Sequence, residues 1–74
     1  MSKRKLIWDF RGSDAKGIAE HYKIHLDEFA QRNNLDSAET GVEEVTGMYC
    51  TAYFVVDESA ESMVRNALRP HRAE

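Results

Sequence analysis

Two histidines four positions apart, His21 and His25, are the side chains of this sequence best placed to do chemistry. On a helix this spacing puts both imidazoles on one flank, which is how paired histidines hold zinc or another divalent transition metal. Glu28 falls on the same flank and could add a carboxylate ligand. It could equally pair with Arg32 or neutralise His25. The pattern therefore permits a metal or catalytic site, and it also fits the polar border of an amphipathic helix.

The sequence excludes several common chemistries. Tyr22 follows the first histidine, where a His-Glu-x-x-His zinc protease needs its glutamate base. Cys50 is the one cysteine, so the chain closes no internal disulfide and lacks the paired thiolates of a structural zinc site. Its neighbours place Cys50 on an apolar strand face, where a thiol behaves as a small hydrophobic group. Without a glycine-rich phosphate loop, a serine nucleophile elbow or a calcium loop, an enzyme is not the leading expectation.

Length and charge narrow the class of protein further. Seventy-four residues, 42% hydrophobic and 31% charged, suit one small globular domain spanning residues 1–74. The net charge of -3 disfavours a dedicated nucleic-acid binder, which needs basic residues against phosphates. No stretch approaches the roughly 20 apolar residues of a membrane span, and the chain does not start as a signal peptide does. We therefore expect a cytoplasmic protein with no membrane partner.

Apolar periodicity predicts the element order β-α-β-β-α. Residues 5–11 alternate as a strand, and a helix is expected over residues 14–33. Strands are expected at residues 40–46 and 48–56, and a second helix at residues 58–69. Because Thr-Gly is a weak hairpin signal, residues 40–56 could instead form one strand with a bulge at Gly47.

Each expected element has one apolar face for the core. The strand faces consist of Leu6, Trp8 and Phe10, and of Met48, Cys50, Ala52, Phe54 and Val56. The helix stripes consist of Ala15, Ile18, Ala19, Tyr22, Leu26 and Phe29, and of Ala60, Met63, Val64, Ala67 and Leu68. A right-handed crossover makes the first two strands parallel, with the third strand between them and both helices on one face. The prediction is an α+β two-layer sandwich with strand order 1-3-2.

This arrangement resembles the split β-α-β, or ferredoxin-like, plan without its last strand. The resemblance is one of expected topology and implies no function, because such sandwiches host many unrelated activities. In this arrangement the first strand has an unpaired hydrophobic edge, which proteins usually cover or pair with another chain.

The open face of the sheet is the other candidate contact surface. It is expected to expose Ile7, Tyr49, Thr51, Tyr53 and Val55. Tyrosines suit protein contacts, although they also suit plain cross-strand packing. Glu43 and Glu44 beside them would repel the phosphates of a nucleic acid.

Two functions from different classes follow. The leading expectation is a non-enzymatic module without a cofactor, which forms a homodimer or binds another protein through the first strand's edge or the tyrosine face. The alternative is a metal- or small-ligand site around His21, His25 and Glu28, with a divalent transition metal as its cofactor.

Overall fold

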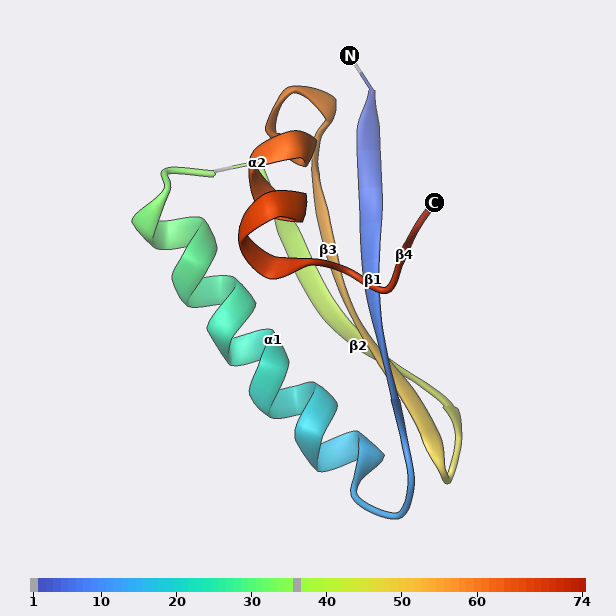
Figure 1. The fold of residues 1–74 in the computed structure, drawn as a ribbon. Helices are drawn as coiled ribbons and strands as arrows, with labels where there is room; N and C mark the ends of the chain where they lie inside the picture. The colour runs from blue at the N-terminus through green and yellow to red at the C-terminus, as the bar shows by residue number, and fades with distance from the viewer. Residues whose placement is uncertain (1, 36) are drawn as a thin grey trace.

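The computed structural model describes residues 2–35 and 37–74. Its elements, in chain order, are β1 (Lys3–Arg11), α1 (Ala15–Arg32), β2 (Glu39–Thr46), β3 (Tyr49–Asp57), α2 (Glu58–Leu68) and β4 (Arg72–Ala73) (Figure 1). The expected helices and first three strands are present, and residues 40–56 form a hairpin rather than one bulged strand. Met1 and Asp36, the latter in the expected connection before the second strand, lie outside the described residues.

The strands form one antiparallel-paired sheet in the order β2-β3-β1-β4. β1 pairs with β3 along its whole length, from Lys3 opposite Asp57 to Arg11 opposite Tyr49. The neighbours β1, β3 and β2 are those expected, but β4 extends the sheet beyond β1. The prediction of three strands with β1 at the edge is therefore wrong. With its last strand in place, the chain has the complete element order of the split β-α-β plan.

Strand β4 is short but covers the edge that the sequence seemed to leave open. It pairs with Leu6 and Ile7 in the middle of β1 (Figure 1). Just beyond it, Lys5 and Glu74 exchange two backbone hydrogen bonds of 3.1 and 2.8 Å. A strand of two residues has no periodicity to detect, which is why the sequence pattern does not predict it.

A side chain continues the pairing just before β4 begins. The backbone N–H of Asp9 donates to Nδ1 of His71 over 2.8 Å, so the imidazole takes the place of a backbone carbonyl. Because Nδ1 accepts this bond, the neutral ring carries its proton on Nε2. The residues after Pro70 thus occupy the edge of β1 from Lys5 to Asp9.

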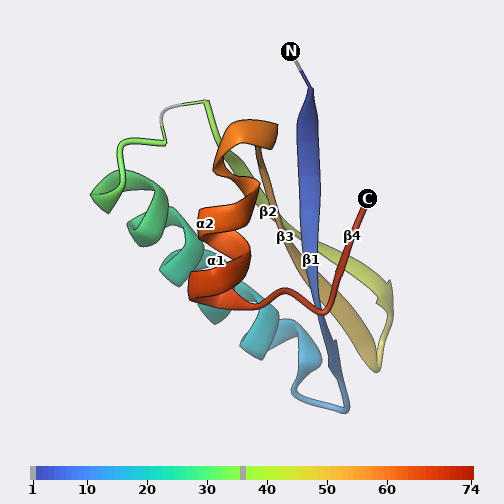
Figure 2. The same ribbon diagram turned by 45° about the horizontal axis from the view of Figure 1, so that its top comes forward.

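Both helices cover the same face of the sheet, as expected (Figures 1 and 2). The buried core between the two layers consists of Leu6, Trp8, Ala15, Ala19, Leu26, Cys50, Ala52, Phe54, Val56 and Val64. Trp8 also donates from its indole nitrogen to the carbonyl of Leu68 over 3.1 Å, which ties the end of α2 to β1. The strand faces predicted for the core are those that pack beneath the helices.

Four residues expected in apolar faces are exposed instead. They are Ile18, Met48, Met63 and Ala67. Ile18 is 47% exposed because it lies at the margin of its helical stripe, where the sheet no longer covers it. Met48 is 58% exposed because it belongs to the hairpin turn rather than to β3.

Gly41 supports an aromatic ring on the face of the sheet away from the helices. It lies opposite Tyr53 in the register of β2 and β3. A Cβ atom added at Gly41 would overlap the Tyr53 ring, so the ring lies directly over the glycine backbone. The absence of a side chain at position 41 is what allows this packing.

Replacing Gly41 with alanine should therefore destabilise the fold by about 1–2 kcal/mol, because the new methyl group displaces the Tyr53 ring. Gly17→Ala is the matched control, since no atom lies within 4 Å of its added Cβ on α1. That change should stabilise the protein by roughly 0.5–1 kcal/mol, as expected for glycine-to-alanine within a helix. Urea unfolding followed by circular dichroism measures both, and equal effects of the two substitutions would contradict the ring packing.

Candidate functional site

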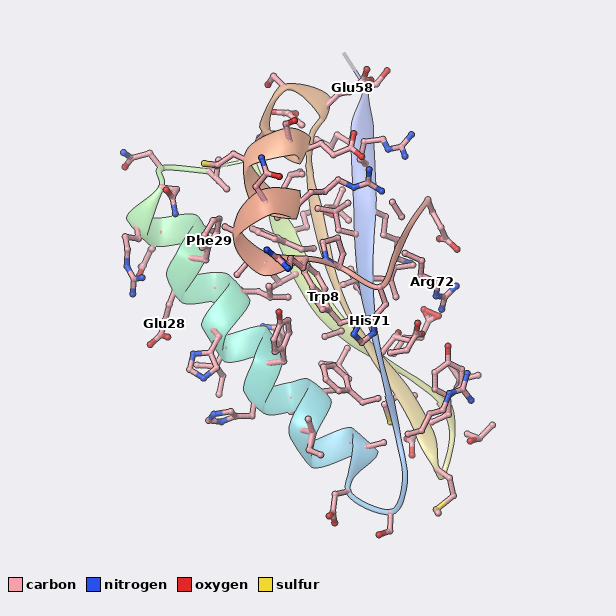
Figure 3. All side chains as sticks on the ribbon, in the orientation of Figure 1. Trp8, Glu28, Phe29, Glu58, His71 and Arg72 are labelled. Carbon is pink, nitrogen blue, oxygen red and sulfur yellow. The ribbon has the colours of Figure 1, made fainter. Side chains whose placement is uncertain are left out.

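Helix α1 is an 18-residue platform held to the sheet along one side. Its buried residues are Ala15, Ala19 and Leu26. Figure 3 shows Phe29 directed toward the sheet and Glu28 directed away from it. The helix ends at Arg32, Asn33 is its C-cap, and Asn34 adopts the left-handed conformation expected at a helix terminus (φ 57°). The flank that bears the candidate residues is therefore free of the fold's own packing.

The two histidines of α1 converge. Nε2 of His21 lies 3.1 Å from Nε2 of His25. The ring centroids are 4.7 Å apart, and the ring planes meet at 82°. Spacing alone places two imidazoles on one flank. The structure adds that their Nε2 atoms lie within hydrogen-bond distance of each other.

Glu28 lies on the far side of the second ring. Its Oε1 is 3.2 Å from Nδ1 of His25, so the carboxylate accepts a hydrogen bond from that nitrogen when it carries the proton. The neutral His25 ring then has an unprotonated Nε2 facing His21. Glu28 is thus placed to orient His25 rather than to be a third ligand beside the two Nε2 atoms. A carboxylate behind a ligating histidine is a common arrangement in metal sites.

The site is open to solvent. The side chains of His25 and Glu28 are each 57% exposed, and His21 is exposed as well. Within residues 2–35 and 37–74, no group of three or more histidine, cysteine or acidic side chains is placed to surround one ion. Cys50 is fully buried in the core and forms no such group with the two histidines of the described chain. A metal at this position would therefore have two protein ligands from one chain.

The second candidate surface, the open face of the sheet, differs from the expectation. Ile7 is 3% exposed and Thr51 is 5% exposed, so the prediction that they face solvent is wrong. Tyr49, Tyr53 and Val55 are half-buried. Ile7 is covered because it now has a neighbouring strand on each side, with Tyr53 opposite it on β3 and β4 on its other flank.

Cationic side chains also cover the tyrosines of this face. Lys5 Nζ lies 4.6 Å from the centre of the Tyr53 ring. The guanidinium of Arg11 lies 4.1 Å from the centre of the Tyr49 ring. Both distances suit cation–π attraction. The aromatic surface available to a partner is thus smaller than the strand pattern indicates.

A polar network joins three strands at the same face. Asp9 accepts hydrogen bonds from the hydroxyl of Tyr49 and from Arg72, whose Nη2 and Nε lie 3.0 and 3.1 Å from its two carboxylate oxygens. The hydrogen bond from Arg72, assisted by that from Tyr49, lowers the pKa of Asp9. The bond to Asp9 in turn raises the pKa of Tyr49.

Sequence reasoning missed this network because it depends on the unpredicted β4. The one signal in the sequence was the hydrophobic edge of β1. Such an edge is usually paired or covered, and the last residues of the chain could have been considered for that role. In the described structure the network fastens Arg72 of β4 to Asp9 of β1 and Tyr49 of β3.

The network of Asp9, Tyr49 and Arg72 should make the free energy of unfolding depend on pH under acidic conditions. Because the folded-state pKa of Asp9 is lowered, its contribution is present above the carboxyl's ordinary value of 3.8 and is lost as pH falls through the lowered value. Asp9→Asn should therefore lower the urea midpoint at pH 7, and the difference from wild type should shrink steadily below about pH 4. Ser13→Ala, at an exposed position of the following turn, is the control. A constant difference between pH 7 and pH 2 would contradict the ionic role of Asp9.

In the part of the chain that the structure describes, no helix combines the length and apolar character needed to cross a membrane. Comparisons with models of protein families, with curated proteins and with solved structures found no match to this chain. Function must therefore be inferred from the chain's own residues, of which the converging histidines of α1 have the most specific geometry.

Proposed function

We propose that this protein binds a divalent transition-metal ion through Nε2 of His21 and Nε2 of His25. The observation that carries the proposal is the 3.1 Å separation of these two atoms. Histidine nitrogens bind zinc at about 2.0–2.1 Å, so the N–Zn–N angle at one ion bound to both would be roughly 100°. That angle is close to the tetrahedral arrangement zinc prefers, and it is compatible with other metals of the series.

The donor set favours particular metals. Imidazole suits zinc, copper, nickel and cobalt, whereas magnesium and calcium prefer oxygen ligands. Glu28 supports the same assignment, since its contact with Nδ1 of His25 leaves the Nε2 lone pair free to bind. Before metal binds, Nε2 of His21 donates a hydrogen bond to Nε2 of His25. When an ion binds, His21 changes to the tautomer protonated at Nδ1, so that both rings stay neutral and both Nε2 lone pairs face the ion.

The site suits binding rather than catalysis. Both histidines are exposed, so nothing in their surroundings excludes water or strengthens charge interactions as an enclosed active site does. Two protein ligands leave the remaining coordination positions to water or to another donor. We therefore favour reversible metal binding as the function over metal-assisted hydrolysis.

The contact module expected from the sequence has less support. Its two motivations were the open edge of β1 and the exposed sheet face, but β4 covers the edge and both Ile7 and Thr51 are buried. The histidine pair, by contrast, converges more closely than its spacing requires.

Titration of the metal-free protein with Zn²⁺ or Cu²⁺ in a calorimeter tests the proposal. We expect His21→Ala and His25→Ala each to weaken binding by at least about tenfold, because each removes one ligand. Glu28→Ala should weaken it by less, roughly tenfold or below, because it loosens a ligand without removing one. Ile24→Ala is the matched control, since this 54% exposed side chain lies between the histidines on α1 and has no donor atom.

Mg²⁺ should not bind measurably to this site. If the alanine variants at positions 21 and 25 bind Zn²⁺ as tightly as the wild-type protein does, then the ion is held elsewhere and the proposal is wrong.

A further inference from the structure

The histidines belong to a longer exposed stripe on α1 and its N-cap. The stripe consists of Asp14, Ile18, His21, His25, Glu28 and Arg32, and every one of these residues is exposed. Successive members are separated by four, three, four, three and four positions. This alternation is the spacing of residues along a seam between two packed helices. Nothing in the described structure packs against this stripe as a second helix, since both helices are occupied in covering the sheet.

The stripe is also symmetric about its centre, at the level of Lys23. A second copy of α1 running antiparallel across a twofold axis at that level would place His21 opposite His25 of the second copy. The same operation would place Asp14 opposite Arg32 of the second copy. The residue numbers of the two pairs, 21 with 25 and 14 with 32, have the same sum, so a single twofold axis forms both pairs.

We infer that two copies of this chain dock through this stripe and hold one metal ion between four imidazoles. The inference rests on the proposed function, because the ion is the link between the copies. His21 and His25 of each copy supply two ligands, and the two pairs complete the four-ligand shell typical of structural zinc. The site within one chain is incomplete, and the second copy contributes the missing half.

Charge complementarity selects the second copy as the occupant. The antiparallel arrangement forms two ion pairs, each between Asp14 of one copy and Arg32 of the other. Within residues 2–35 and 37–74, neither residue has an ion pair in the single chain. In the same register Ile18, which is 47% exposed, lies opposite Glu28 of the other copy, whose methylene groups are the apolar surface it can contact. Both Glu28 carboxylates would lie behind the ligating rings, where their charge offsets that of the ion.

The other edge of the sheet is a poorer place for self-association. A second copy pairing antiparallel along β2 would bring its Glu43 and Glu44 close to the same residues of the first copy, and these side chains are exposed. Acidic residues on an edge strand oppose such pairing. The α1 stripe has no such repulsion and is therefore the surface we assign.

The metal should be required for the dimer. One pair of helices meeting through a mostly polar stripe buries too little apolar surface to hold two chains together alone. Sedimentation velocity should therefore show a monomer in the presence of a chelator and a dimer with Zn²⁺. Calorimetry should give one Zn²⁺ ion per two chains, and Co²⁺ should give the strong visible absorption of a four-coordinate site.

The outcomes separate the two proposals. A monomer that binds one Zn²⁺ per chain through His21 and His25 would overturn the dimer and leave the proposed function intact. A protein that binds no Zn²⁺ at these histidines would overturn both. A dimer that survives the chelator would overturn the shared-ion arrangement, since its interface would not depend on the metal.

Charge substitutions test the antiparallel register. Arg32→Glu should weaken Zn²⁺-linked dimerisation by at least about tenfold, because it places two acidic pairs across the seam. The double variant D14R/R32E should recover most of this loss, since it reverses both partners of each ion pair. Asp14 makes no side-chain capping bond in α1, so its replacement is compatible with folding, which circular dichroism would verify. Lys16→Glu, an equal change of charge on the opposite flank, should leave dimerisation unchanged, and an equal loss there would overturn the register.

Discussion

The structure depends on β1 being an internal strand. It pairs with β3 over nine residue pairs and with β4 on its other side. One consequence is that both faces of β1 are covered, with Leu6 and Trp8 beneath the helices and Ile7 beneath side chains of its own sheet. A chain of this length has little apolar surface to spare, and the centre of β1, where Leu6, Ile7 and Trp8 are buried on both faces of the sheet, makes efficient use of it. The helices are then free to present their outer flanks to solvent.

The two faces of the sheet are stabilised by different interactions. The helix-covered face is an apolar core, in which Phe54 and Leu6 are fully buried. The opposite face has no helix above it, and its own charged side chains lie over the tyrosines or bridge strands through Asp9. A face closed in this way is compatible with water and offers little continuous apolar area to a partner. Function is therefore more reasonably sought on α1 than on the sheet.

The sequence was informative where periodicity extends over several turns or residues. Alternation identified Leu6, Trp8 and Phe54 as core residues, and spacing brought His21 and His25 to one flank. It failed where a contact depends on a segment too short for a pattern, as β4 is, and this hid the burial of Ile7. It also could not decide among three roles for Glu28, because its spacing permits a metal ligand, an ion pair with Arg32 or a contact that neutralises His25. Only ring and carboxylate positions distinguish these roles.

If the histidine pair binds metal as proposed, its position on α1 couples that binding to folding. Two imidazoles four positions apart hold their Nε2 atoms 3.1 Å apart only while the intervening turn is helical. An ion that needs both nitrogens therefore binds the folded helix in preference to the unfolded chain, and it stabilises the fold by mass action. Because α1 covers β2 and β3 and supplies three buried side chains, that stabilisation reaches the whole sandwich. A small domain with no disulfide and a modest core would thereby gain stability when the metal is present.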